Sequence, residues 1–289
     1  MKYNFSRTKK LMYIVWLSAL SLIAVLGLCS CSGSQGEVDA QNGDFTGLKV
    51  TAAESDSWKY DTETNKLTVM KDGVTVSGTV EDDILIECYV DVSELSLNGV
   101  QQGEHSVSLK TDITDKDMVI DVSGDNDIDN VLALGDMTIK GTKNSGLDIG
   151  KGIFAAEDLV LQDVKIRTKG LVADNDMSIY GSSDVKVDIN GEDFSDLITS
   201  AAKARHDILI DLSAGGRFEV TSDRDEGGFI YAGNRLSLGK SIEITNPSGS
   251  IVDHASSASV KNGEADKKWQ LITDKTGGIA YDVVMEGTN

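Results

Sequence analysis

A short unit recurs in the middle of the chain. Its two complete copies read Gly152-Ile-Phe-Ala-Ala-Glu-Asp-Leu-Val-Leu161 and Gly170-Leu-Val-Ala-Asp-Asn-Asp-Met-Ser-Ile179. Residues 132–139 keep the second half of the unit, and residues 228–238 form a stretched copy in which Arg235 replaces the aspartate. One such unit cannot bury its own apolar face, so recurring units of this kind are typical of a stack in which neighbours share a core.

The spacing of the strand-like runs indicates what kind of stack this is. The most similar runs begin at Leu95, Met118, Met137, Leu159, Met177, Ile208 and Leu236, in steps of 23, 19, 22, 18, 31 and 28 residues. Steps near twenty fit one coil of a parallel β-helix, and the two long steps fit coils with insertions. One insertion, at residues 195–205, is moderately helical in composition. Tight Asn-Gly and Asp-Gly hairpins, which an antiparallel β-sandwich would need, are scarce. We therefore predict an all-β solenoid, with a β-sandwich as the alternative.

The first thirty residues carry the features of a secretory signal. Lys9 and Lys10 precede an apolar run that extends from residue 11 to residue 28. That run is nearly long enough to cross a bilayer, so a retained anchor is the alternative. The sequence Leu28-Cys29-Ser30-Cys31 resembles the lipobox of bacterial lipoproteins, in which a small residue directly precedes the acylated cysteine. We predict lipidation at Cys31, location at the outer membrane of the cell envelope, and membrane contact only through that lipid.

The remainder of the chain divides into two parts. Residues 31–47 are mostly small and polar, which is typical of a flexible tether. Residues 48–289 are predicted to form the β-helix domain, with a repeat core at about 84–245. Trp58 and Tyr60 belong to a hairpin-like segment ahead of the repeats, where they are expected to cap the open end of the solenoid.

Charge and cysteine content limit the possible partners. Removal of the leader takes away four basic residues and leaves 23 basic and 47 acidic residues, a net charge of −24. A field of this sign disfavours nucleic acids and anionic membrane surfaces as partners. Cys88 would be the single cysteine of the folded part, and its place in an alternating apolar run indicates a small buried hydrophobic residue.

Several motifs together resemble a known family. They are Trp58-x-Tyr60, Val119-Ile-Asp-Val-Ser-Gly-Asp-Asn126, Met137-Thr-Ile-Lys-Gly141 and Gly152-Ile-Phe-Ala. In this order they resemble the carbohydrate-binding β-helix lipoproteins of gut and plant-degrading bacteria, over residues 58–244. The resemblance implies a right-handed parallel β-helix that binds an acidic or plant-type polysaccharide, with calcium as a candidate cofactor, without cleaving it. The segment from Trp269 to Met285 matches no motif of that family.

Two acidic segments are candidate calcium sites because they place oxygen ligands close together. The candidate ligands are Asp125, Asp127, Asp129, Asp188, Asn190 and Glu192. Neither segment has the spacing of an EF-hand loop. The alternative interpretation is that these residues cap turns in a very acidic protein.

One basic row is a candidate ligand surface. Lys165, Arg167 and Lys169 alternate, so their side chains are expected on the outer face of one strand. Tyr180 is expected to point outward as well, where it could stack on a sugar. The row would form either a cradle for an acidic sugar or a ladder of ion pairs with carboxylates of neighbouring coils.

Alignment of neighbouring coils places Lys165 between Asp148 and Lys186, and Arg167 beside Asp188. The ladder and the cradle both depend on this register.

Nucleophilic catalysis has little support in the sequence. His105, His206 and His254 lie far apart, and no Gly-x-Ser-x-Gly elbow occurs. A polysaccharide lyase would need an arginine or lysine base beside a calcium cluster. Non-catalytic polysaccharide binding is thus the first hypothesis, a surface adhesin or protein-binding solenoid the second, and a lyase the third.

Overall fold

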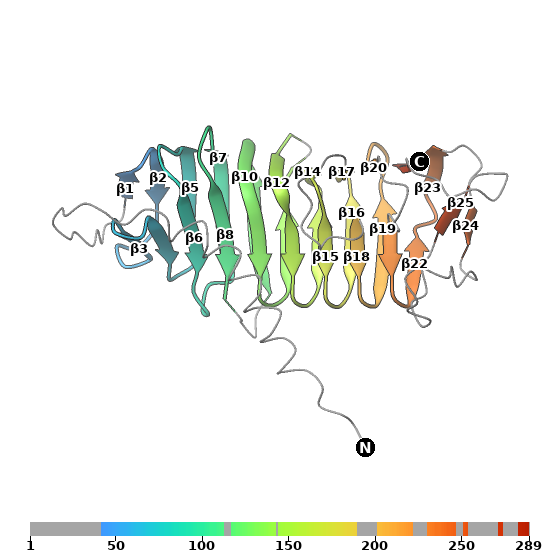
Figure 1. The fold of residues 1–289 in the computed structure, drawn as a ribbon, viewed down its shortest axis with the longest axis horizontal. Helices are drawn as coiled ribbons and strands as arrows, with labels where there is room; N and C mark the ends of the chain where they lie inside the picture. Colours follow the sequence, from blue (N-terminus) through green and yellow to red (C-terminus); the bar gives the residue numbers. More distant parts are fainter. Residues whose placement is uncertain are drawn as a thin grey trace, which may run out of the picture. The chain divides into compact units, whose positions relative to one another are not determined.

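In the middle of the chain a coil consists of three short strands separated by sharp corners. In one coil these are β13 (Leu159–Gln162), β14 (Lys165–Thr168) and β15 (Leu171–Ala173). The next coil comprises β16 (Met177–Gly181), β17 (Asp184–Asp188) and β18 (Ala202–Ala204). Each strand pairs in parallel with its counterpart in the preceding coil. The prediction of a parallel β-helix is therefore confirmed, and the sandwich alternative is wrong (Figure 1).

The structure, a computed structural model, describes residues 42–112, 117–142, 144–189, 201–221, 230–246, 251–253, 271–273 and 283–288. Within these ranges the chain forms strands, turns and bends, and no helix. No helix in this described part is long and apolar enough to cross a membrane. The last residues of the 195–205 insertion, which looked helical from composition, form strand β18.

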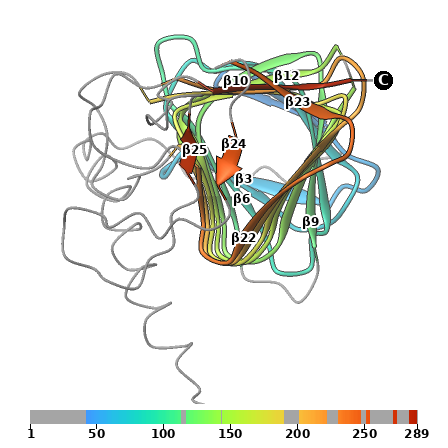
Figure 2. The same cartoon turned by 90° about the vertical axis from the view of Figure 1, so that its right-hand side faces the viewer.

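Three sheets enclose the core and form the sides of the solenoid (Figure 2). The first contains the first halves of β5 (Val74–Thr79) and β7 (Glu94–Gln101), then β9 (Met118–Ser123), β11 (Met137–Lys140), β13, β16, β19 (Asp207–Leu212) and β22 (Arg235–Leu238). The second contains the first halves of β10 (Asp125–Ala133) and β12 (Gly146–Ala155), then β14, β17 and β20 (Arg217–Thr221). The third contains β4 (Lys66–Val69), β6 (Ile84–Cys88), β8 (Val107–Thr111), the second halves of β10 and β12, β15, β18 and β21 (Ile230–Ala232).

The register of the first sheet follows the predicted spacing, with one exception. Met118, Met137, Leu159, Met177, Ile208 and Leu236 occupy one column of successive strands. Leu95, however, pairs with Ile120 and not with Met118, so that coil is two residues longer than expected. The repeat also reaches further toward the start of the chain than residue 84, because β4 already pairs in parallel with β6.

The recurring unit of the sequence now has a structural explanation. Its alanine lies in an inward column of the third sheet that includes Ala133, Ala155 and Ala173, all buried. Its aspartate forms the next corner, where each carboxylate accepts the backbone N–H of the equivalent aspartate one coil later. The N-to-Oδ1 distances are 2.9 Å for Asp158 to Asp136, 3.0 Å for Asp176 to Asp158 and 2.8 Å for Asp207 to Asp176. The unit therefore encodes corners and core positions.

The solenoid begins with antiparallel strands. β1 (Asn42–Phe45), β2 (Leu48–Thr51) and β5 pair antiparallel in that order, and β3 (Trp58–Asp61) forms a hairpin with β4. Trp58 is fully buried and Tyr60 is 2 % exposed, with the ring of Phe45 stacked on Tyr60 at a centroid distance of 3.9 Å. The expected aromatic cap is thus present, and the first described strand, β1, lies ahead of Leu48.

The opposite end is built differently. β26 (Val283–Gly287) lies between β20 and β23 (Ile242–Asn246) and runs antiparallel to both. In the same region β24 (Ile251–Asp253) and β25 (Leu271–Thr273) pair with each other in a separate two-stranded sheet.

Candidate functional site

The candidate site is the outer face of the second sheet, where charged side chains form two columns that run across the strands. One column consists of Asp127, Asp148, Arg167, Lys186 and Glu219. The other consists of Asp125, Gly146, Lys165, Asp184, Arg217 and Glu286. On β14 the outward residues Lys165 and Arg167 alternate with the buried Ile166 and Thr168, as predicted.

The predicted register of this row is wrong by two residues. Arg167, and not Lys165, lies between Asp148 and Lys186, whereas Lys165 lies between Gly146 and Asp184. The buried column to which Ile166 belongs fixes the pairing, and the outward neighbours must follow it.

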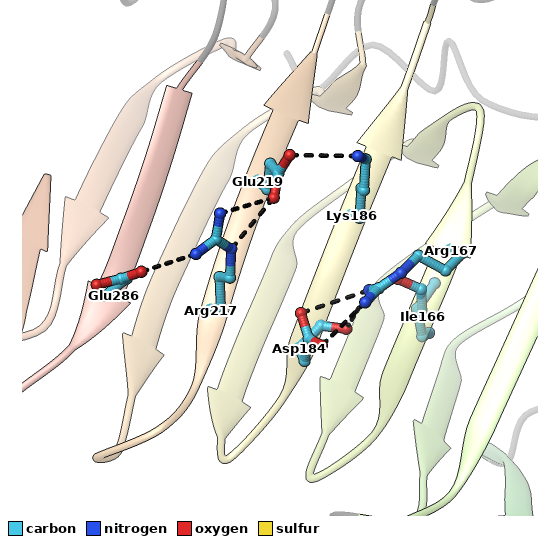
Figure 3. A network of polar contacts seen from close by, with 7 residues as sticks. All are labelled: Ile166, Arg167, Asp184, Lys186, Arg217, Glu219 and Glu286. Atoms are coloured by element: carbon cyan, nitrogen blue, oxygen red, sulfur yellow. Dashed lines mark hydrogen bonds and ion pairs between the residues drawn. The ribbon is translucent and has the colours of Figure 1, made fainter. Parts of the chain in front are cut away.

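Arg167 is held by its neighbour strand and does not lie beside Asp188. Its Nη2 lies 3.0 Å from Oδ2 of Asp184, and its Nη1 donates to Oδ1 of the same carboxylate at 3.4 Å. Nη1 also donates to the carbonyl oxygens of Ile166 and Asp184, at 3.1 Å and 3.3 Å (Figure 3). The guanidinium is therefore oriented along the sheet by one carboxylate and two backbone groups.

A second network joins β17, β20 and β26. Arg217 donates from Nε and Nη2 to Oε2 of Glu219, at 3.1 Å and 2.9 Å, and from Nη1 to Glu286 at 2.8 Å. Lys186 lies 3.3 Å from the other oxygen of Glu219 (Figure 3). Burial alone would raise the pKa of Glu219, but the hydrogen bonds from Arg217 and Lys186 outweigh it and lower that pKa below its ordinary value.

The two halves of this face differ in charge. The outward positions of β10 and the first half of β12 carry Asp125, Asp127 and Asp148. Burial and the nearby carboxylate of Asp148 raise the pKa of Asp127, although Gln102 donates a hydrogen bond to it at 2.9 Å.

The other half contains the basic side chains, together with the carboxylates of Asp184, Glu219 and Glu286. Lys165, Arg167, Lys186 and Arg217 occupy outward positions on three adjacent strands of an otherwise acidic chain. Lys165 is exposed and forms no ion pair within the described part of the chain.

The remaining predicted ligand residues lie apart from this network. Lys169 follows β14 and is half-buried, with no ion pair to any residue that the structure describes. Tyr180 points outward as expected, but on the first sheet, in the column of Gln162 and Asp211. The structure therefore brings Lys165 and Arg167 together and leaves Tyr180 on another side of the solenoid.

The first acidic segment does not close around a common point. Asp129 forms an ion pair with Lys151 at 2.7 Å, Asp127 binds Gln102, and Asp125 is exposed. Among the residues that the structure describes, no group of three or more His, Cys, Asp or Glu side chains is arranged to hold a metal ion. Of the second acidic segment Asp188 is described, in register with Thr221, whereas Asn190 and Glu192 lie outside the described residues, as does Cys31.

One feature was missed in the sequence. Leu132, Phe154 and Val172 lie in register on the outer face of the third sheet, each half-buried, and form an apolar strip across three strands. Tyr231 belongs to the same column, two strands further along. The signal was the variable position before the alanine of the recurring unit, which is apolar in these copies although it faces outward.

Cys88 is a buried cysteine on the third sheet, away from the charged columns. Burial raises the pKa of the Cys88 thiol to about 12, so this residue is an inert core side chain.

Comparisons with known protein families, with curated proteins and with solved structures find no match to this chain. The resemblance to carbohydrate-binding β-helix lipoproteins accordingly stays a prediction that depends on short motifs.

Proposed function

We propose that this protein is a lipid-anchored, non-catalytic component of the cell envelope that binds an acidic polysaccharide across its second sheet. The observation that carries the proposal is the gathering of Lys165, Arg167, Lys186 and Arg217 on adjacent strands of a chain with a strong negative charge. An anionic polymer would be repelled by most of such a surface and least by this part, where four cations face the carboxylates of Asp184, Glu219 and Glu286.

The repetition of the surface supports a polymeric ligand. Neighbouring strands lie about 4.8 Å apart, which is close to the length of one sugar unit. Successive sugars of a polymer that lies across the strands would therefore each meet the side chains of a new strand. Arg167 and Arg217 are held in place by carboxylates, and Lys165 is exposed beside them. Exposed ion pairs contribute little free energy, so carboxylates of a ligand can compete for these cations.

The fold is compatible with binding proteins and with lyases alike, and the polar network favours binding. A lyase base must reach the substrate proton, whereas Arg167 is engaged by Asp184 and two carbonyl groups.

Calcium belongs to the proposal as an additional bridge between ligand carboxylates and the acidic half of the face, where Asp125 and Asp127 point outward.

A retention assay on immobilised polysaccharides tests this proposal. We expect the wild-type chain to bind acidic polymers such as polygalacturonate more tightly than neutral ones, and binding to weaken with added salt. Lys165→Glu should reduce binding several-fold. Lys140→Glu is the matched control, because it makes the same charge change on the first sheet, where Lys140 pairs with Glu94 and Asp121. Equal effects of the two substitutions, or retention on no glycan, would contradict the proposal.

The same assay separates the remaining hypotheses. Each polymer is tested with calcium and with a chelator, so that a calcium bridge appears as a loss of binding upon chelation. The polymer is then examined for new unsaturated ends, which would show lyase activity and overturn the non-catalytic interpretation.

A second candidate function, protein binding, is favoured by the apolar strip of Leu132, Phe154 and Val172. Contiguous apolar surface on a charged protein often marks a protein interface. Phe154→Ser should then abolish capture of a protein partner from envelope extracts and leave polysaccharide retention unchanged. An unchanged capture profile would contradict this candidate.

A further inference from the structure

The insertion of β26 makes the last described step of the stack wider on the second sheet than on the first. On the first sheet β19 pairs directly with β22 across this step. On the second sheet β26 occupies the position between β20 and β23. The second sheet is thus wider here by one strand, about 4.8 Å.

The slot between β20 and β23 holds β26 by backbone pairing, by the buried side chains of Val284 and Met285, and by one ion pair. Met285 is fully buried between the two neighbouring strands, in register with Phe218. Glu286 lies opposite Arg217, with 2.8 Å between Oε1 and Nη1. The N–H of Thr288 donates to the carbonyl of Ser241 at 2.6 Å. This is the pattern of β-strand addition, in which main-chain bonds supply affinity and alternate side chains supply specificity.

Two properties make this strand exchangeable. First, β20 and β23 can pair with each other when β26 leaves, as their counterparts β19 and β22 do on the first sheet, so an empty slot need not leave a row of unpaired backbone groups. Secondly, residues 247–282 separate β23 from β26, and the described strands among them, β24 and β25, pair with each other and not with a described strand of the main sheet. A strand swapped between copies makes the same contacts as one inserted within its own chain.

We propose that the slot between β20 and β23 is an interaction surface for a second copy of this chain, which exchanges its β26 reciprocally to form a dimer. The contacts in the two slots of the dimer are those of the single chain, and protein concentration decides between the two states. This inference is independent of polysaccharide binding.

Charge complementation tests the exchange. Arg217→Glu in one tagged copy and Glu286→Arg in a differently tagged copy each place like charges opposite each other within one chain. A reciprocal swap between the two copies restores an opposite pair in both slots. The two side chains are 41 % and 42 % exposed, so neither substitution should prevent folding.

The two copies are unfolded and refolded together at high concentration, and the second tag is measured after capture of the first. We expect about tenfold more co-capture than for two wild-type copies, because each like-charge pair disfavours the closed single chain. The control is a chain that carries both Arg217→Glu and Glu286→Arg, which restores the pair internally and should return co-capture to the wild-type level. Co-capture that is no greater in the complementary mixture than in the wild-type mixture or in the control would overturn the proposal.

Discussion

Both ends of the solenoid are finished with antiparallel strands, but the strands occupy different places in the stack. At the first end β1 and β2 lie outside β5, and the hairpin of β3 and β4 covers the core with Trp58. At the other end β26 lies inside the second sheet, held on both edges, and contributes Met285 to the core. At the first end large aromatic side chains cover the core, whereas at the other end a single strand fills the space between β20 and β23. Both ends therefore contribute to the core, but we expect the aromatic cap to contribute more to stability than the inserted strand.

The largest effect is expected from removal of the aromatic cap. Trp58→Ala deletes a fully buried indole and should lower the free energy of unfolding by about 3–5 kcal/mol. Urea denaturation measures the loss, with Lys49→Ala on the exposed side of β2 as the control. If the two variants unfold within about 1 kcal/mol of each other, the first end is not a structural cap.

A methionine pair compares the inserted strand with the interior of the stack. Met177 and Met285 are both fully buried, the former between β13 and β19 and the latter between β20 and β23. Truncation of a buried methionine to alanine costs about 2–5 kcal/mol, and we expect Met177→Ala near the top of that range and Met285→Ala near the bottom. The reason is that β26 lies next to β23, the last described strand of its sheet, so this end of the stack can open locally, whereas Met177 lies in the interior of the stack. Equal losses in thermal unfolding would show that β26 is as firmly integrated as an interior strand.

Much of the interior was predictable because its residues repeat. The column from Met118 to Leu236 followed from spacing, and the hairpin at Trp58 followed from alternation around a turn. The basic row on β14 was correctly placed outward, but its neighbours were not. Outward partners depend on how many residues each corner contains, and corners vary in length from coil to coil.

The inserted strand could not be read from the sequence for a related reason. β26 is a five-residue run, Val-Val-Met-Glu-Gly, that belongs to no repeat, and nothing in it specifies which two edges it joins. The apolar strip was missed because Phe154 follows a buried isoleucine in the recurring unit and looks like part of the core. Local alternation identifies faces, whereas pairing between distant segments is decided by the closed geometry of the coil.

The aspartate corners provide a smaller test within the regular part of the solenoid. Asp158 accepts hydrogen bonds from the backbone N–H of Asp176 and from the side chain of Asn175. Asp158→Ala leaves both donors without this partner and should cost about 1 kcal/mol. Asp158→Asn keeps an acceptor oxygen. The pKa of Asp136 is raised mainly by burial and, to a smaller extent, by the charge of Asp158, which this substitution removes. Urea denaturation should therefore rank asparagine close to wild type and alanine below it, and the reverse order would contradict a capping role.

The smallest expected effects are changes in stability, and their dependence on pH should distinguish the two halves of the charged face. The pKa of Glu219 is lowered in the folded state, so its contribution to stability is present above the ordinary value and is lost as the pH falls through the lowered pKa. The pKa of Asp127 is raised, so its contribution is present below the ordinary value and is lost as the pH rises through the raised pKa. At pH 7 Glu219→Gln should therefore destabilise the chain and Asp127→Asn should stabilise it, each by less than about 1 kcal/mol. Denaturation midpoints measured from neutral pH down to acid should show both differences shrink. The same sign for the two variants at pH 7 would contradict the contrast between a paired carboxylate and a repelled one.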